Sequence, residues 1–301
     1  MDRRHFLTTS GLLLAGIPLL GRATRPTTAA SFDILRSNIG YYTDRGGTIG
    51  VYLPDGRPEG GVVVDTQFAD SARTLLETVE ERGELARLSL LVNTHHHGDH
   101  TSGNGVLAPL AELHVAHERA VENLERSQAE KEAGERVPLP KKTFAREMAT
   151  DVPGGEVVHL RHFGAAHTGG DTVVHFQNAN VAHLGDLVFN RRFPYIDPEA
   201  GGSLTNWAEV LRDIRKFYGK DTLFLFGHAA EGYPVFGTHS DLRAMENYLR
   251  SLRKYVRKER RRGTSLEALQ AKTVVVPGAP EWKYGERLRD VNLEVMWGEL
   301  D

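Results

Sequence analysis

The fold is decided by one stretch, residues 93–100 (NTHHHGDH), which directly follows the short apolar run 88–92 (LSLLV). The apolar run predicts a buried strand, so the histidines begin where that strand ends. Four histidines and one carboxylate within six residues need a shared partner, and a metal ion supplies one. In an extended chain His95 and His97 point to one side, whereas Asp99 and His100 lie at the turn beyond and can face a second centre.

The composition limits which ligands such a metal can have. The 301 residues include 14 histidines and no cysteine, which excludes disulfides, cysteine nucleophiles, iron–sulfur clusters and thiolate ligands. Any metal must therefore be held by nitrogen and oxygen. With 37 basic and 40 acidic residues the net charge is −3, which gives no overall signature of nucleic-acid binding. The hydrophobic share of 40% is ordinary for a globular protein with ample core.

Three later residues lie in similar settings, at turns or strand ends close to glycine. His167 lies within residues 164–170 (GAAHTGG), and Asp186 and His228 each follow a glycine at the end of an apolar run. Glycine lets one backbone segment approach another closely, so side chains from such positions can converge.

The remainder of the chain alternates strand-like and helix-like patterns. We expect strands at 48–53, 61–65, 88–92, 113–115, 157–161, 172–176, 181–184 and 222–226. We expect helices capped by Asp70, through 121–124, from Ser203, over 242–256 and from a capping-box pattern at 264–267. Residues 128–150 are charged and are expected to form a loop, a candidate flap. Without a repeat or a linker, residues 31–301 are predicted to form one domain with a helical C-terminal extension.

Residues 1–30 have the pattern of an export signal. A paired arginine, Arg3-Arg4, precedes a ten-residue apolar stretch at 11–20, which is too short to span a membrane. Small residues follow, and Thr28-Ala29-Ala30 is a candidate cleavage site. The paired arginine resembles a twin-arginine signal, which implies export of an already folded protein. We therefore expect a periplasmic or otherwise exported protein, whose mature chain would carry a net charge of −6.

The sequence resembles the metallo-β-lactamase superfamily over nearly all of residues 45–230. The family motif H-x-H-x-D-H is matched in the first stretch, and the family's later ligands fall on the three residues near glycine. The resemblance implies an α+β fold, a four-layer αβ/βα sandwich with the metals at one edge. The matching residues are His95, His97, Asp99, His100, His167, Asp186 and His228.

The resemblance also implies a dinuclear site and a reaction. One metal would take His95, His97 and His167, the other would take Asp99, His100 and His228, and Asp186 would bridge them. Nitrogen and carboxylate ligands suit two zinc ions, with iron or manganese as alternatives. A metal-bound hydroxide, oriented by the catalytic residue Asp99, would attack the carbonyl of an ester, thioester, lactone or amide.

Three other functions stay open: a β-lactamase, a sulfur dioxygenase with a single iron, and a metal-binding accessory protein without turnover. Lactamases of the family often have cysteine at the position of Asp186 or dispense with that ligand, which lowers the first alternative. Oxygen-reducing diiron relatives have glutamate at the position of His97, which argues against that branch.

Residues around the motif supply further candidates. The segment after Asp186 offers possible substrate contacts, and residues near the motif offer hydrogen bonds that would hold the ligands in place. His96, at a variable position of the motif, is given no ligand role. The candidate substrate contacts are Arg191, Arg192, Tyr195 and Asn206, and the candidate supports are Asp65, Asn93 and Thr94.

The only long basic cluster is residues 253–262 (RKYVRKERRR). A nuclease branch of the superfamily exists, but we interpret the cluster as the solvated face of a long helix whose inner face carries Leu249, Leu252 and Val256. The expected partner is a small-molecule substrate, with no nucleic acid and no stable membrane span.

Overall fold

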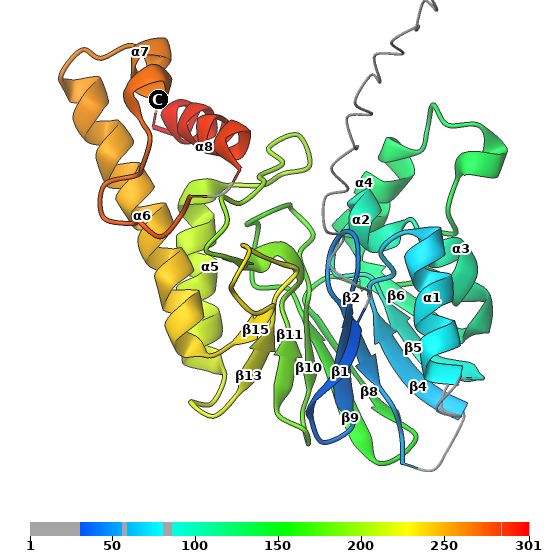
Figure 1. Ribbon diagram of the computed structural model, residues 1–301. Coiled ribbons are helices and arrows are strands. Elements are labelled where there is room, and N and C mark those ends of the chain that lie inside the picture. Colours follow the sequence, from blue (N-terminus) through cyan, green and yellow to red (C-terminus); the bar gives the residue numbers. More distant parts are fainter. Residues whose placement is uncertain (1–30, 56–58, 81–85, 284, 301) are drawn as a thin grey trace, which may run out of the picture.

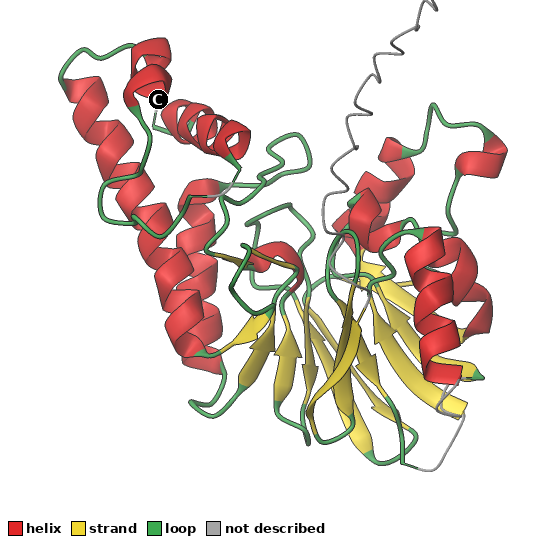
Figure 2. Ribbon diagram, in the orientation of Figure 1, coloured by secondary structure: helices red, strands yellow, loops and turns green. Residues whose placement is uncertain are grey.

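The computed structural model describes residues 31–55, 59–80, 86–283 and 285–300, so the predicted export signal lies outside the described residues. Two β-sheets lie face to face, and helices cover the outer side of each (Figure 1, Figure 2). The described chain is therefore an α+β sandwich of four layers, as predicted.

The first sheet has seven strands in sequence order. Its first four strands pair antiparallel, and the last four pair parallel. The strands are β1 (Ser31–Arg36), β2 (Ile39–Thr43), β3 (Ile49–Tyr52), β4 (Glu59–Val64), β5 (Arg87–Val92), β6 (Ala111–His117) and β7 (Lys142–Phe144).

The second sheet has six strands in the order β15-β13-β11-β10-β9-β8 and is also mixed, since only β11 and β13 pair parallel. Its strands are β8 (Glu147–Val152), β9 (Glu156–Arg161), β10 (Val173–Phe176), β11 (Val181–His183), β13 (Leu223–Leu225) and β15 (Phe236–Gly237). A separate parallel pair, β12 (Phe189–Asn190) and β14 (His228–Ala229), joins two loops at one end of this sheet.

The helices divide between the two outer faces (Figure 1). Beside the first sheet lie α1 (Ala69–Glu80), α2 (Gly98–Thr101), α3 (Asn104–Leu107) and α4 (Glu118–Ser127). Beside the second sheet lie α5 (Leu204–Phe217) and α6 (His239–Arg261), followed by α7 (Leu266–Lys272) and α8 (Glu286–Gly298). Short 3₁₀ turns are η1 (Ala108–Leu110), η2 (Ala133–Glu135) and η3 (Gly185–Leu187).

Alternation along the strands produces three hydrophobic cores. In β4, Val62 and Val64 face the core between the sheets, whereas Val63 faces the core under α1. In β10, Val174 faces the central core and Val173 faces the core under α5 and α6. Because these strands are buried on both faces, they appear in the sequence as continuous apolar runs.

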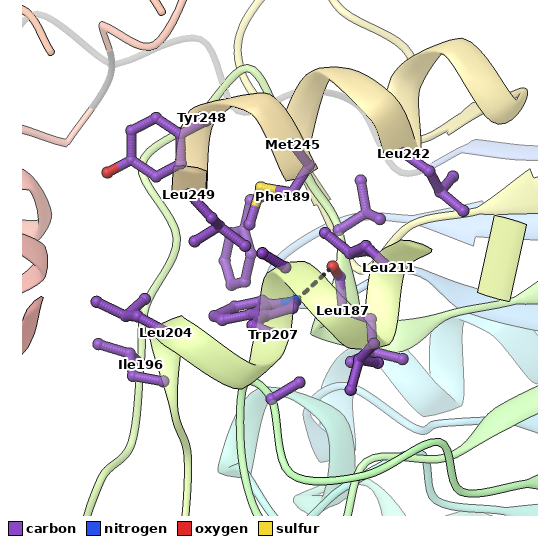
Figure 3. Close-up of a cluster of buried hydrophobic side chains, with 14 of the residues drawn as sticks. Leu187, Phe189, Ile196, Leu204, Trp207, Leu211, Leu242, Met245, Tyr248 and Leu249 are labelled. Atoms are coloured by element: carbon purple, nitrogen blue, oxygen red, sulfur yellow. Dashed lines mark hydrogen bonds between the residues drawn. The ribbon is translucent and has the colours of Figure 1, made fainter. Parts of the chain in front are cut away.

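The core under α5 and α6 also positions part of the site. Trp207 of α5 is fully buried, and its indole Nε1 donates a 2.9 Å hydrogen bond to the carbonyl of Leu187 in η3 (Figure 3). Met245 and Leu249 of α6 pack in the same cluster. The turn that carries Asp186 is therefore fixed by the packing of two helices.

Several expectations need correction. Residues 128–150 are not one loop, because they include η2, β7 and the start of β8. Strand β8 lies at a sheet edge with alternate residues exposed, so charged residues are compatible with it. Helix α1 begins at Ala69, which places Asp70 in its first turn and not at the cap. Strands β1 and β2 and helix α8 were not predicted.

No helix among the described residues is both long enough and apolar enough to cross a bilayer.

Candidate metal centre

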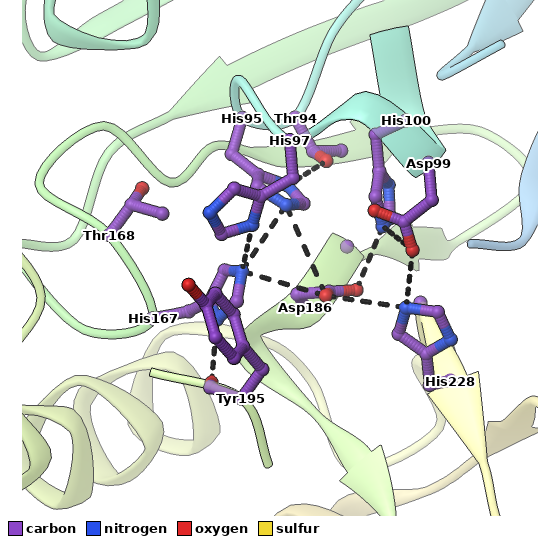
Figure 4. A network of polar contacts seen from close by, with 12 residues as sticks. Thr94, His95, His97, Asp99, His100, His167, Thr168, Asp186, Tyr195 and His228 are labelled. Carbon is purple, nitrogen blue, oxygen red and sulfur yellow. Dashed lines mark hydrogen bonds and ion pairs between the residues drawn. The ribbon is translucent and has the colours of Figure 1, made fainter. Parts of the chain in front are cut away.

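The seven predicted ligands come from four places that meet at one end of the two sheets (Figure 4). Strand β5 ends at Val92, and its histidine stretch runs directly into α2, which contains Asp99 and His100. His167 lies in the loop between β9 and β10, Asp186 lies in η3, and His228 begins β14. The structure thus brings together residues that are up to 133 positions apart in the chain.

The first group consists of three imidazoles and one carboxylate. His167 Nε2 lies 2.9 Å from His97 Nδ1 and 3.2 Å from His95 Nε2. Asp186 Oδ2 lies 3.5 Å from His167 Nε2 and 4.0 Å from His95 Nε2. All four ligand atoms lie within 4.8 Å of one another, which is a suitable spacing for holding one metal ion.

The second group consists of Asp99, His100 and His228, again with ligand atoms within 4.8 Å of one another. His228 Nε2 lies 3.1 Å from Asp99 Oδ2, and His100 Nε2 lies 3.8 Å from the same oxygen. Asp186 contacts this group too, with Oδ1 at 3.1 Å from His100 Nε2 and Oδ2 at 3.4 Å from His228 Nε2. Asp186 therefore lies between the two groups, as a bridging ligand would.

Two buried atoms in this cluster, His100 Nε2 and Asp186 Oδ1, lie 3.1 Å apart and make no well-aligned hydrogen bond with any described residue. Buried polar atoms in native proteins are normally well hydrogen-bonded, so such atoms call for an explanation. Both atoms point into the cluster, and both are typical ligand atoms for divalent metals. The donor set of nitrogen and carboxylate oxygen therefore fits a metal centre.

Burial and charge divide the cluster into two electrostatic environments. Burial lowers the pKa of His167 to about 3, and burial followed by the charge of neighbouring histidines lowers the pKa of His95 well below its usual value. Burial also opposes protonation of His228, but Asp186 and Asp99 outweigh it and raise its pKa to about 9. His95 and His167 are thus neutral imidazoles, the form that binds metals, whereas the carboxylates around His228 attract positive charge.

The far nitrogen of each imidazole in the first group is held by an acceptor, as Figure 4 shows for His95 and His167. His95 Nδ1 donates to Thr94 Oγ1 at 3.0 Å, and His167 Nδ1 donates to the Tyr195 carbonyl at 2.9 Å. His97 Nε2 donates to Asp197 Oδ2 at 3.0 Å. These bonds select the tautomer that leaves the inward nitrogen as an acceptor.

Asp65 supports the site as expected. Its Oδ2 accepts from His100 Nδ1 and from Thr94 Oγ1, both at 2.7 Å, and its Oδ1 accepts from the Thr94 amide at 2.7 Å. One buried carboxylate therefore orients ligands of both groups. Asn93 acts less directly, because its Nδ2 donates to the His100 carbonyl at 3.3 Å and not to a ligand side chain.

Asp197 was missed by sequence analysis. Besides His97 it contacts His96, whose Nε2 lies 3.4 Å from Asp197 Oδ2, and the three residues form a further group with candidate ligand atoms within 4.8 Å of one another. Against the effect of burial, its bonds with His96 and His97 hold the pKa of Asp197 well below its usual range. No local sequence signal pairs Asp197 with a histidine 100 positions earlier.

The four candidate substrate contacts separate into two pairs. Tyr195 lies at the mouth of the site, 42% exposed, with its ring 5.2 Å from that of His97. Arg192 lines a cavity of about 850 Å³ together with His228, Tyr41 and Tyr233. Both can reach a substrate near the cluster.

Arg191 and Asn206 are placed elsewhere, which corrects the expectation. The guanidinium of Arg191 contacts Asp241 Oδ1 at 3.3 Å and lies 5.3 Å from the centre of the Trp282 ring. Asn206 Nδ2 donates to the carbonyl of Ala165 at 2.6 Å. These two side chains tie loops to the helical layer and do not face the cluster.

The four-layer sandwich carries, at the ends of its strands, seven His and Asp side chains that could hold metal ions. Residues 43–276 match the family model of the metallo-beta-lactamase superfamily, and the chain belongs to this superfamily. Its members are typically hydrolases.

Solved structures show the same fold. The inverting sec-alkylsulfatase Pisa1 from Pseudomonas sp. aligns with a TM-score of 0.69 at 13% identity, covering 90% of this chain and 50% of that one. A metallo-beta-lactamase from Pontibacter korlensis aligns with a TM-score of 0.56 at 19% identity, covering 73% of this chain and 99% of that one. At these identities the likeness concerns the fold alone.

A curated relative is the alpha subunit of 2,4-dinitroanisole O-demethylase from Nocardioides sp. (strain JS1661). It is 25% identical over 171 residues, which are 56% of this chain and 49% of that protein. The chain thus matches about half the length of this relative.

Proposed function

We propose that this protein is a hydrolase with two divalent metal ions, zinc in the first instance, that cleaves an ester, thioester, lactone or amide of a small molecule. One observation carries the proposal. Seven donor side chains from four separate segments form two adjacent groups, with Asp186 between them.

Divalent ions at such a site polarise a substrate oxygen and lower the pKa of water, so that hydrolysis proceeds near neutral pH. The side chains supply orientation and proton handling. Asp99 is the most accessible of the seven, with 31% of its side chain exposed, and its contacts with His100 and His228 both use Oδ2. Its other oxygen is therefore available to orient a water molecule and accept its proton.

Tyr195 and Arg192 flank the site on the substrate side. The Tyr195 hydroxyl can donate to a substrate oxygen at the mouth. Arg192 makes no ion pair with any described residue, is half-buried, and lines the same cavity as His228. It is therefore placed to bind a carboxylate or another anionic group on the substrate.

The relatives widen the substrates to be tested. Pisa1 is a sulfatase, and the curated relative is an O-demethylase, so a sulfate ester and an aryl methyl ether belong beside carboxylic substrates. A cephalosporin covers the lactamase alternative.

The test combines metal analysis with a substrate panel. Purified protein should contain about two metal ions per chain. Hydrolysis of at least one panel member should fall by about 10²-fold or more in Asp99→Ala, which removes a predicted metal ligand together with the proposed proton acceptor. Metal analysis of the same variant separates the two effects. Asp151→Ala, a change at an exposed carboxylate in β8, is the matched control and should leave activity unchanged.

Other results would identify the alternatives. One tightly bound iron without hydrolysis would favour the dioxygenase. Two metals without turnover of any substrate would favour an accessory protein. Full activity in Asp99→Ala would contradict the catalytic role of this residue.

We also propose that residues 1–30 direct export through a twin-arginine route, which the paired Arg3-Arg4 supports. A fluorescent reporter fused to residues 1–30 should be found outside the cytoplasm of a bacterial host. The double variant Arg3→Lys/Arg4→Lys should be retained inside, and equal export of both fusions would contradict the route.

A further inference from the structure

Most of the basic residues in the segment 253–262 line a cavity. None of the seven candidate ligands, which together we call the metal-ligand cluster, is among its lining residues. The cavity, about 660 Å³, lies where the second half of α6 passes the first turns of α5 (Figure 1). Its lining includes seven basic residues and one acidic residue, Glu209, in a chain whose net charge is −3. A second cavity of about 380 Å³ shares Arg257 and Arg261 with the first and continues the basic surface.

Repulsion between these closely spaced cations lowers the stability of α6. Along α6 they form two rows in which successive cations are four residues apart. Residues at this spacing are neighbours on a helix surface, so the two rows contain five neighbouring pairs of like charge. Each such pair destabilises a helix by about 0.2–0.5 kcal/mol. The attraction of a helix C-terminus for cations accounts for the last turn but not for residues two and three turns earlier. The rows are Arg250, Lys254, Lys258 and Arg262, and Arg253, Arg257 and Arg261.

Protein carboxylates do not neutralise this charge. Arg250 pairs with Glu209 and Glu246, and Arg262 pairs with Glu259. The other five cations of the two rows make no ion pair or hydrogen bond with any residue in the described part of the chain. The cavity therefore has an excess of positive charge that an anion would balance.

Two buried donor groups border the same cavity without a hydrogen-bond partner among the described residues: Arg253 Nε and Thr205 Oγ1. Leaving such groups unpaired is costly. The lining also includes Leu204, Ala208 and Leu249, which are at most 5% exposed, so the apolar wall beside the cations consists of small parts of these residues together with the aliphatic stems of the Arg and Lys side chains. A ligand that satisfies all of these features has an anionic head and an apolar portion.

We propose that this cavity binds a phosphate monoester or diester that carries an apolar substituent. Arginine forks match the oxygens of a phosphate in pairs, and several arginines converge here. The apolar lining would cover the substituent. The ligand could be a soluble phosphate ester or the headgroup region of an anionic phospholipid, which share this chemistry.

The experiment uses two probes on the full protein with its metal bound. Hexylphosphonate, which has no ester bond to be hydrolysed, is titrated by calorimetry, with inorganic phosphate as the comparison that lacks the apolar portion. Vesicles of phosphatidylglycerol and phosphatidylcholine are tested by co-sedimentation against vesicles of phosphatidylcholine alone. Binding of the phosphonate indicates a soluble ligand, and binding of the anionic vesicles alone indicates the lipid.

Variants locate the binding. Arg253→Gln/Arg257→Gln should weaken it by at least about tenfold, because two charge-assisted contacts are lost. Lys254→Gln/Lys258→Gln, which changes only exposed positions, should also weaken it and protects the test against misfolding of the first variant. Arg243→Gln/Lys220→Gln removes the same charge outside the cavity and should leave binding unchanged. His167→Ala should leave it unchanged too, which separates this cavity from the metal-ligand cluster.

The inference is overturned if neither probe binds, or if binding persists undiminished in both cavity variants. Loss of binding in His167→Ala alone would assign the phosphonate to the metal-ligand cluster and would also overturn it. Binding of an RNA oligonucleotide without binding of either probe would replace a phosphate-ester site with a nucleic-acid surface.

Discussion

The absence of a Cβ atom at two glycines lets the backbone approach the side chains of the metal-ligand cluster closely. A Cβ on Gly227 would lie 1.9 Å from Asp186 Oδ1, and one on Gly47 would lie 2.1 Å from His100 Cε1. Asp186 and His100 are both buried and have little freedom to move away. The backbone therefore forms part of the wall of the cluster, and only glycine fits at these two positions.

Gly227→Ala should disrupt the bridge between the two metal groups. The new methyl group would displace the Asp186 carboxylate, so metal content should fall from about two ions per chain to one or none. Inductively coupled plasma mass spectrometry measures this directly. Gly105→Ala, at a site with no atom within 4 Å of the added carbon, is the matched control. Equal metal content in the two variants would contradict the close-packing account.

Asp197→Asn should weaken metal binding while the protein stays folded. The amide keeps the shape of the side chain but loses the charge that orients His97, and comparable changes cost about 10–100-fold in metal affinity. Competition with a zinc-binding dye measures the affinity. Glu199→Gln, at an exposed position two residues further along the same loop, should have no effect. Unchanged affinity in Asp197→Asn would restrict this carboxylate to a structural role.

At the scale of elements, loop-to-helix junctions are fixed by side-chain caps. Ser203 caps α5 by accepting from the Asn206 amide, and Thr238 forms a capping box with Asp241 at the start of α6. His117 caps α4 in an unusual way, since its Nδ1 accepts from the Arg119 amide while its Nε2 donates to the Ala145 carbonyl. Both bonds require a neutral ring, so this junction is sensitive to protonation.

The His117 cap predicts a pH dependence of stability. Burial and neighbouring His162 lower the pKa of His117 to about 4 from its usual 6.5. The unfolded chain therefore takes up the proton first, and the contribution of this cap is complete above pH 6.5 and is lost as the pH falls towards 4. The contribution of His117 to the free energy of unfolding therefore changes by at most about 1.4 kcal/mol per pH unit.

Urea denaturation between pH 7.5 and 4.5 measures this slope. His117→Asn keeps a capping oxygen without the titration, and its stability should fall less steeply below pH 6.5. His239→Asn, at a half-buried position, serves as control for other groups that titrate in this range. The prediction is wrong if wild type and His117→Asn lose stability in parallel.

At the scale of the whole molecule, the metal-ligand cluster joins the two sheets. The histidine stretch follows β5 of the first sheet, whereas His167, Asp186 and His228 follow or precede strands of the second sheet and its adjoining pair. Ions bound by both sets of ligands would hold the two halves of the sandwich together, so metal binding and folding are expected to be coupled.

Removal of metal should therefore lower the melting temperature. A ligand present at 100 times its dissociation constant stabilises the folded state by about 2.7 kcal/mol, which corresponds to about 5 °C or more here. Differential scanning fluorimetry with a chelator, followed by zinc titration, measures the loss and its recovery. Asp186→Ala, which removes the ligand between the two groups, should respond less than the wild type to both treatments. Identical melting of the wild type with and without chelator would contradict the coupling.

The sequence by itself determined the fold class and the set of candidate ligands. The H-x-H-x-D-H spacing is local, and burial of the strands on both faces leaves long apolar runs that can be recognised without coordinates. The sequence also predicted the long amphipathic helix, and Leu249, Leu252 and Val256 lie on its buried face as expected. Edge strand β8 could not be recognised, because its inward positions Met148 and Thr150 are only half-buried and Thr150 is polar, which leaves a weak alternating pattern.

Two features were decided only by the tertiary structure. One is which side chains orient the candidate metal ligands, and the other is which cations lie close together without an ion-pair partner among the described residues. Asp197 reaches His97 across 100 positions, and no pattern in a single sequence records such a pairing. The cavity between α5 and α6 arises from the packing of two helices, so a basic run expected as solvated surface became a candidate binding site. Residue types and local spacing are properties of the chain, whereas distances between remote segments exist only after the strands and helices have packed.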